Sequence, residues 1–181
     1  MRKVLFLDFD GVLVKFKSPR KKSRPAVADS AAMANLNRIV AETGAVAVLS
    51  TDWRLHNDCA SLMKVLEKWG FAGEVIGTAP ASVDDKRLAV LSGIEQIRAH
   101  DEGARVAVLD DEDLDLQEQV LIDPMTGLTD TNANDAVAKL NSVDALLSVE
   151  ALLARYMPSA VESIAKIVVQ DLLDIAKGFN I

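Results

Sequence analysis

The sequence predicts an α/β fold of three layers, in which helices cover both faces of a central parallel sheet. Short apolar, β-rich segments alternate along the chain with longer segments of helical periodicity, which is the pattern of βαβ units. Polar residues directly follow several of the apolar segments, and parallel sheets place their ligand sites at these strand ends. The length of 181 residues allows one domain with a full core, and 50% of the residues are hydrophobic.

Each expected strand is a short apolar run that is bounded by glycine, proline or polar residues. We expect strands at residues 3–9, 45–49, 74–76, 105–109 and 120–122. The expected helices carry apolar residues at helical spacing and have capping residues at their ends. We expect one from Asp29 or Ser30 to Gly44, one after Ser50–Arg54 that ends at Gly70, one that begins at Asp84 or Asp85, and a short one at 133–140.

The character of the chain changes at about residue 142. Residues 1–141 contain the α/β pattern, whereas residues 142–181 have the pattern of two helices that are broken at Pro158. Apolar residues cover more of the second helix than one packing surface needs. We therefore expect an α/β domain at 1–141 and a helical extension at 142–181, which packs on the core or joins copies of the chain in a homo-oligomer.

The end of the first expected strand carries two acids, Asp8 and Asp10, and then Gly11. Side chains on a strand alternate between its faces, so the two carboxylates are predicted to point the same way. Gly11 allows the backbone to turn sharply after them. Two carboxylates at the end of a buried strand are costly unless a cation compensates them, and Mg²⁺ prefers oxygen ligands. The pattern predicts a metal site rather than two acids that cap a loop.

Two other expected strands also end in polar residues. Ser50 and Thr51 follow the second strand, and Asp110 and Asp111 follow the fourth. Ser50 alone would be interpreted as a helix cap, but its place beside the first strand indicates a site residue. Thr51 is the alternative if that strand ends one residue later. Three strands thus bring polar groups to one edge of the sheet.

Residues 15–24 contain six lysines and arginines. This basic run is either a solvated linker or a flap that meets an anionic substrate, and the sequence leaves both open. The net charge of −7 argues against a general nucleic-acid-binding protein, because phosphate backbones attract basic surfaces.

Other reactive residue types are given structural interpretations. His56 and His100 lack the spacing of metal ligands, and Cys59 has no paired histidine, so it is expected to fill space. Trp53 and Trp69 are expected to be packing anchors. One cysteine permits no disulfide within the chain, and the short apolar run at its start is no signal peptide. We therefore expect a cytoplasmic protein that does not associate with membranes.

The strand-end residues resemble the motifs of a known superfamily. The sequence from Asp8 to Leu13 resembles the first motif of the haloacid-dehalogenase (HAD) superfamily, Ser50 its second motif, and Asp110-Asp111 its acidic fourth motif. The strings at 49–54, 76–80 and 123–129 resemble a compact HAD subfamily found in RNA-repair proteins. The resemblance implies a Rossmann-like HAD core, and the short segment after the first strand leaves room for a small cap or none.

The resemblance also implies a mechanism. Asp8 would be the nucleophile that forms an aspartyl-phosphate, and Asp10 would be the general acid and then the base. Mg²⁺ would bind Asp8, the main-chain carbonyl of Asp10 and Asp110, with Asp111 as an alternative ligand or a more distant acid. Ser50 would donate its hydroxyl to a phosphoryl oxygen.

The positive charge opposite the phosphate is harder to place. Members of the superfamily carry a basic residue before the fourth motif, and Lys86 and Arg87 are both candidates here. The resemblance does not separate them. Arg54 either reaches the phosphate or pairs with an acid.

The resemblance therefore predicts a Mg²⁺-dependent phosphatase that cleaves a phosphomonoester of a small molecule or of a nucleic-acid end. One alternative is a non-catalytic HAD-like interaction module whose C-terminal helices bind a partner. The complete motif set argues against it, because a site that no longer catalyses a reaction should have lost at least one of the motif residues. A second alternative is a dehalogenase. The superfamily's dehalogenases need neither the second acid nor Mg²⁺, so Asp10 argues against it.

Overall fold

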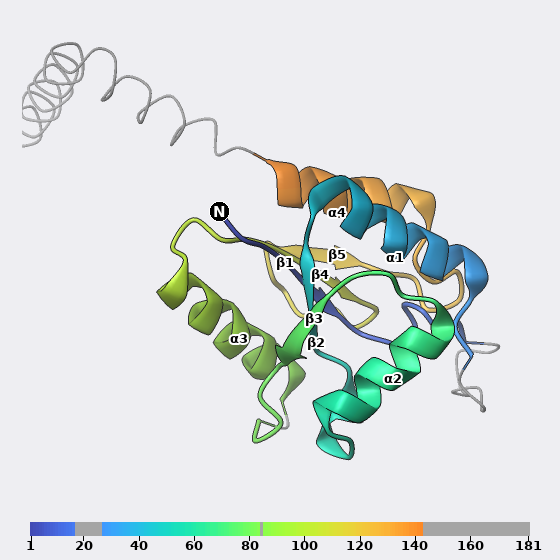
Figure 1. Ribbon diagram of the computed structural model, residues 1–181, viewed down its shortest axis with the longest axis horizontal. Coiled ribbons are helices and arrows are strands. Elements are labelled where there is room, and N and C mark those ends of the chain that lie inside the picture. The colour runs from blue at the N-terminus through green and yellow to red at the C-terminus, as the bar shows by residue number, and fades with distance from the viewer. Residues whose placement is uncertain (17–26, 84, 143–181) are drawn as a thin grey trace, which may run out of the picture. The chain divides into compact units, whose positions relative to one another are not determined.

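The computed structural model describes residues 1–16, 27–83 and 85–142, and it confirms the α/β class. Five parallel strands form one sheet in the order β3-β2-β1-β4-β5 (Figure 1). The strands are β1 (Lys3–Leu7), β2 (Val46–Leu49), β3 (Val75–Thr78), β4 (Arg105–Asp110) and β5 (Gln119–Leu121). The order reverses direction at β1, so the carboxyl ends of β1, β2 and β4 meet at the place where such sheets bind ligands.

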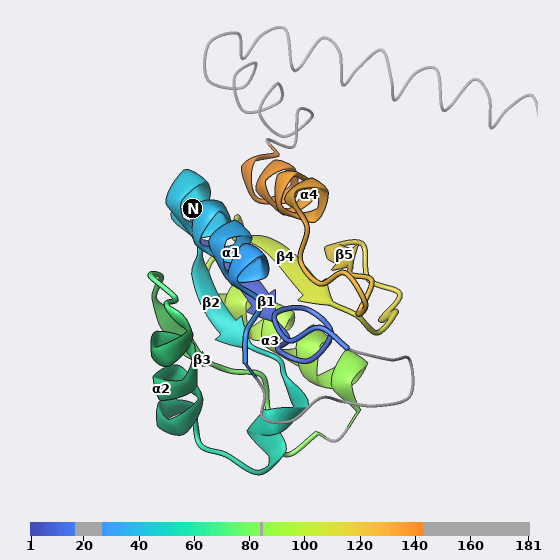
Figure 2. The same cartoon turned by 90° about the vertical axis from the view of Figure 1, so that its right-hand side faces the viewer.

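Helices cover both faces of the sheet, as the sequence predicts. Within the described residues they are α1 (Ser30–Thr43), the 3₁₀ helix η1 (Asp52–Leu55), α2 (Cys59–Trp69), α3 (Lys86–His100) and α4 (Asp130–Asn141). Figure 2 shows α1 and α4 side by side on one face, and α3 on the other. No helix among the described residues is long and apolar enough to cross a membrane.

The alternation of side chains on β1 divides the core into two clusters. Leu5 and Leu7 pack with α1, α2 and α4, whereas Val4 and Phe6 pack with α3. All four side chains are fully buried, as expected for a central parallel strand. Gly93 lets α3 approach closely, because a Cβ atom there would lie 2.7 Å from the Phe6 ring.

The helix ends follow the predicted caps. The Asp29 side chain accepts hydrogen bonds from the main-chain N–H groups of Ala31 and Ala32, and Gly44 ends α1 with a φ of +68°. Asp85 caps α3 by accepting from the N–H of Leu88 at 2.8 Å, so the helix begins at Lys86. The other candidate cap, Asp84, lies outside the described residues.

Several element boundaries differ from the prediction. β1 ends at Leu7 rather than residue 9, because the Phe9 N–H donates to the Asp8 side chain instead of a neighbouring strand. The segment after Ser50 first forms η1, and α2 begins only at Cys59, where Asp58 caps it. β3 extends to Thr78, and α4 begins at Asp130, three residues before the predicted start.

Residues Met1–Asn141 form one compact unit. The predicted helices of the C-terminal extension and most of the basic run at 15–24 lie outside the described residues, so the extension, the homo-oligomer and the flap stay predictions.

Candidate active site

Asp8 lies at the point where the chain leaves β1, and its side chain is buried. The Phe9 N–H donates to Oδ1 at 2.7 Å, and the Lys86 ammonium donates to Oδ2 at 2.7 Å. Both carboxylate oxygens of Asp8 therefore accept a hydrogen bond, one from a main-chain N–H group and one from an ammonium group. The Asp8 carboxylate is therefore held in one orientation at the carboxyl end of β1, and its role as a nucleophile stays a prediction.

Lys86 is the first residue of α3 and pairs with two carboxylates. Its Nζ lies 2.7 Å from Oδ2 of Asp8 and 3.0 Å from Oδ1 of Asp110. Burial alone would lower the pKa of Lys86, but the charges of Asp8 and Asp110 together raise it above its usual value. The ammonium therefore stays charged over the ordinary pH range.

Arg87 points elsewhere, although it is adjacent in sequence. Its Nε donates to the main-chain oxygen of Leu114 at 2.8 Å, and the residue is exposed. Of the two basic candidates, the structure thus brings only Lys86 to the acids.

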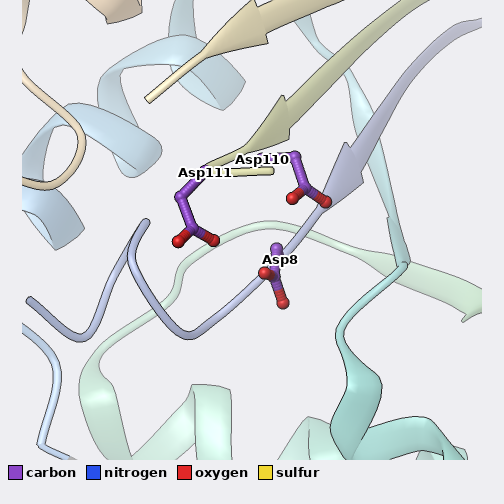
Figure 3. A group of neighbouring side chains, drawn as sticks. All are labelled: Asp8, Asp110 and Asp111. Atoms are coloured by element: carbon purple, nitrogen blue, oxygen red, sulfur yellow. The ribbon is translucent and has the colours of Figure 1, made fainter. Parts of the chain in front are cut away.

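Three acids at the ends of β1 and β4 form a group that could hold a metal ion. Ligand atoms of Asp8, Asp110 and Asp111 all lie within 4.8 Å of one another, and Figure 3 shows the carboxylates turned toward a common space. Burial and the charge of Asp8 raise the pKa of Asp110 to about 7, and the same two causes raise the pKa of Asp111 to about 6. Such shifts indicate more negative charge than Lys86 alone compensates.

The donor chemistry of this group fits Mg²⁺. All three members offer carboxylate oxygens, the ligand type that Mg²⁺ prefers. Oδ1 of Asp110 accepts from Lys86 and from the N–H of Glu112, whereas Oδ2 is buried and has no hydrogen-bond partner among the described residues. A buried carboxylate oxygen without a partner is costly, and a cation would satisfy it.

Gly11 is required for the shape of this site. Its φ is +76°, and a Cβ atom built on it would lie 2.3 Å from Cγ of Asp111. Only glycine allows both this backbone conformation and the close approach of the turn to the acid. The sequence predicts the turn at Gly11, but not its contact with Asp111.

Asp10 lies beside the acid group and makes a separate contact. Its Oδ2 accepts a hydrogen bond from the indole Nε1 of Trp53 at 3.0 Å. Its side chain is not part of the group Asp8, Asp110 and Asp111, and the expected metal contact through its main-chain carbonyl stays a prediction. Trp53 does pack against Phe9 and Trp69, as expected of an anchor, but its contact with Asp10 was not predicted.

The two hydroxyl candidates after β2 have different surroundings. Ser50 is fully buried next to β1, where its N–H donates to Leu7 at 2.9 Å. Its Oγ has no hydrogen-bond partner among the described residues, so it can still serve a bound group. Thr51 caps η1, because its side chain accepts from the N–H of Trp53. Of the two, Thr51 has the capping role.

Arg54 pairs with an acid and with main-chain oxygens rather than entering the cavity described below. Its guanidinium is fully buried and donates to Ser50 and Thr51, to the side chain of Asp52, and to Val83. It thereby ties the segment after β2 to the segment before α3. Its role in the described structure is to hold these two segments together.

A small cavity opens above Asp8. It has a volume of about 90 Å³ and is lined, among the described residues, by Asp8, Asp10, Phe16, Asp52, Lys86, Asp111 and Glu112. Typical sites for drug-sized ligands measure roughly 300–1,000 Å³. The enclosed space therefore suits a small chemical group, with the remainder of a larger ligand outside it.

Three lining residues were not predicted: Phe16, Asp52 and Glu112. Asp52 and Glu112 lie within two positions of predicted site residues, which is a signal that could have found them. With them, the described part of the cavity lining contains five carboxylates and one ammonium. An anionic ligand would need additional positive charge to enter.

A family model matches residues 4–133, from β1 into α4, whereas no curated protein and no solved structure matches the chain. The match spans every lining residue of the cavity and the three acids of the metal-ligand group. It agrees with the superfamily and the subfamily that the motifs resemble. The chain therefore belongs to the family described as the HAD domain in Swiss Army Knife RNA repair proteins.

Proposed function

We propose that the protein is a Mg²⁺-dependent phosphohydrolase, which cleaves a phosphomonoester through an aspartyl-phosphate on Asp8. The observation that carries this proposal is the placement of the Asp8 carboxylate. It lies in the lining of a phosphate-sized cavity, paired with Lys86 and within 4.8 Å of two further acids. Membership of a HAD family supports hydrolase chemistry in general.

The residues of the site have separate roles in this reaction. A carboxylate oxygen of Asp8 bonds to phosphorus while the bond from phosphorus to the leaving oxygen breaks, and Asp10 gives that oxygen a proton. Asp10 then accepts a proton from the water that releases phosphate. Lys86 offsets the negative charge beside Asp8, and the hydroxyl of Ser50 is available to a phosphoryl oxygen.

The cavity explains why the reaction would require a divalent cation. Among the described residues of the lining, a phosphate dianion would meet five carboxylates and a single ammonium. Mg²⁺ held by Asp8, Asp110 and Asp111 would supply the positive charge that allows the two anions to approach each other. A location in the cytoplasm, where Mg²⁺ is abundant and a lone cysteine stays reduced, is part of this proposal.

A phosphatase assay tests the proposal. We expect the purified full chain to hydrolyse 4-nitrophenyl phosphate with Mg²⁺ and to lose this activity in EDTA. Asp8→Asn should abolish turnover, because the amide is not a nucleophile, whereas Asp113→Asn, a change at an exposed acid outside the lining, should not. Absence of Mg²⁺-dependent turnover on a broad panel of phosphate esters would favour the non-catalytic module instead.

The family match favours one class of substrate as a second, narrower candidate. The family is described from RNA repair proteins, so we propose phosphorylated nucleic-acid ends as substrates. Neutralising Lys21, Lys22 and Arg24, which lie outside the described residues, should raise KM for a 3′- or 5′-phosphorylated oligonucleotide more than KM for an aryl phosphate. Equal effects on both substrates would exclude a role of the basic run in binding nucleic acid.

A further inference from the structure

The indole of Trp53 lies beside the acid Asp10, although the two residues are 43 positions apart. Its Nε1 donates to Oδ2 of Asp10 at 3.0 Å, and both side chains are half-buried. Trp53 belongs to η1, directly after the Ser50-Thr51 strand end. The contact therefore links two motifs of the site.

Packing holds the indole ring in this orientation. The ring contacts Phe9 edge to face at a centroid distance of 5.6 Å, and it contacts Trp69 at 6.0 Å. Thr51 and Arg54 fix the backbone on either side, through the cap of η1 and the buried guanidinium. The donor is thus positioned before any ligand enters, which is what a positioning residue requires.

The chemistry of the indole determines what this contact can do. Tryptophan carries one N–H donor and no acceptor, so Oδ2 of Asp10 can only accept. The hydrogen bond therefore restrains the rotation of the Asp10 carboxyl group. We propose that Trp53 is a positioning residue, which holds the carboxyl group of Asp10 in the cavity lining. This inference rests on the proposed phosphohydrolase.

The proton transfer follows directly. As a carboxylate oxygen of Asp8 bonds to phosphorus, the electron pair of the breaking bond goes to the leaving oxygen, which takes a proton from Asp10. Asp10 becomes a carboxylate, and it accepts a proton when water attacks the aspartyl-phosphate. The hydrogen bond from Trp53 restrains the carboxyl group of Asp10 in both steps.

Two aryl esters separate a positioning role from a packing role. Phenyl and 4-nitrophenyl phosphate have leaving groups of similar shape, but phenolate is the more basic and depends more on protonation. Trp53→Phe keeps an aromatic ring and removes the N–H. We expect it to lower kcat/KM for phenyl phosphate by about tenfold and for the nitrophenyl ester by about twofold. Trp69→Phe, the matched control in the same aromatic cluster, should leave the ratio of the two values unchanged.

A measurement without substrate tests the contact itself. The chain has two tryptophans, so a ¹⁵N-labelled sample should give two indole N–H signals, which the two Phe variants assign. Asp10→Ala should shift the Trp53 signal and speed its exchange with solvent, and should leave the Trp69 signal in place. An unchanged Trp53 signal would overturn the inference, whatever the activity.

The outcomes for the two proposals are distinguishable. Wild-type turnover with equal losses on both esters in Trp53→Phe would overturn only the positioning role. Absence of wild-type turnover on both esters would remove the phosphohydrolase and the positioning role together. Unequal losses, with the control unchanged, would support both.

Discussion

Replacing Lys86 by methionine should destabilise the metal-free protein, because Lys86 is the ammonium that pairs with the buried acids. The change keeps an unbranched side chain, one atom shorter, and removes the charge 2.7 Å from Asp8 and 3.0 Å from Asp110. Removing one partner of a buried ion pair costs about 3–5 kcal/mol. The pKa of Asp110 is already about 7, so this carboxyl can take up a proton and limit the cost. We expect a loss of about 3 kcal/mol in the free energy of unfolding.

Thermal unfolding in EDTA at neutral pH measures this loss. For a domain of this size each kcal/mol corresponds to roughly 3–4 °C, so Tm should fall by about 10 °C. The neighbouring change Arg87→Met removes one hydrogen bond of an exposed side chain and should lower Tm by about 3 °C or less. Equal values of Tm for wild type and Lys86→Met would refute the reasoning.

The sign of the pH dependence provides a second check on the same variant. The folded-state pKa values of Asp110 and Asp111 are raised from 3.8, so the stability that their neutral forms contribute is complete below about pH 4 and is lost as the pH rises through about 6 to 7. Lys86 reduces this loss only while these acids are charged. The difference in Tm between wild type and Lys86→Met should therefore shrink as the pH is lowered toward about 5.

Two further predictions concern the metal-ligand group. Protons compete with Mg²⁺ for Asp110 and Asp111, so the rise in Tm that a fixed Mg²⁺ concentration causes should be smaller at about pH 5.5 than at about pH 8; an equal rise would argue against these ligands. Gly11→Ala places a Cβ atom 2.3 Å from Cγ of Asp111, at a φ of +76°. It should cost about 1–3 kcal/mol and abolish the Mg²⁺-induced rise, whereas Gly77→Ala, which meets no atom within 4 Å, should leave the rise intact.

The sequence could predict those site residues that are identified by their immediate neighbours along the chain. Asp8 and Asp10 follow an apolar run directly, and the acids after β4 do the same, so strand ends alone bring them to one edge. The reasoning for Asp10 was nevertheless wrong in one step. β1 ends at Leu7, so alternation within that strand does not by itself orient residues 8–10, although both acids line the cavity.

The contacts that the sequence could not predict join distant segments. Lys86 and Arg87 both stand at a helix start, and only the cap at Asp85 and the packing of α3 decide which of them faces the acids. Arg54 reaches Val83 across 29 positions, and Trp53 reaches Asp10 across 43. A pattern along the chain carries no information on such pairs, because they depend on how the loops above the sheet fold.

Gly93 allows α3 to pack closely on the sheet, and this close packing also determines the position of Lys86 at the start of the helix. Lys86 lies seven residues before it on α3, about 10 Å along the axis. A side chain at position 93 would meet Phe6 and lift the helix from the sheet, and the ammonium would move away from Asp8 with it. Random mutagenesis scored by activity should therefore recover substitutions of this core glycine together with those of the acids. The distance between the Lys86 ammonium and Asp8 therefore depends on the absence of a side chain at Gly93, two helical turns away.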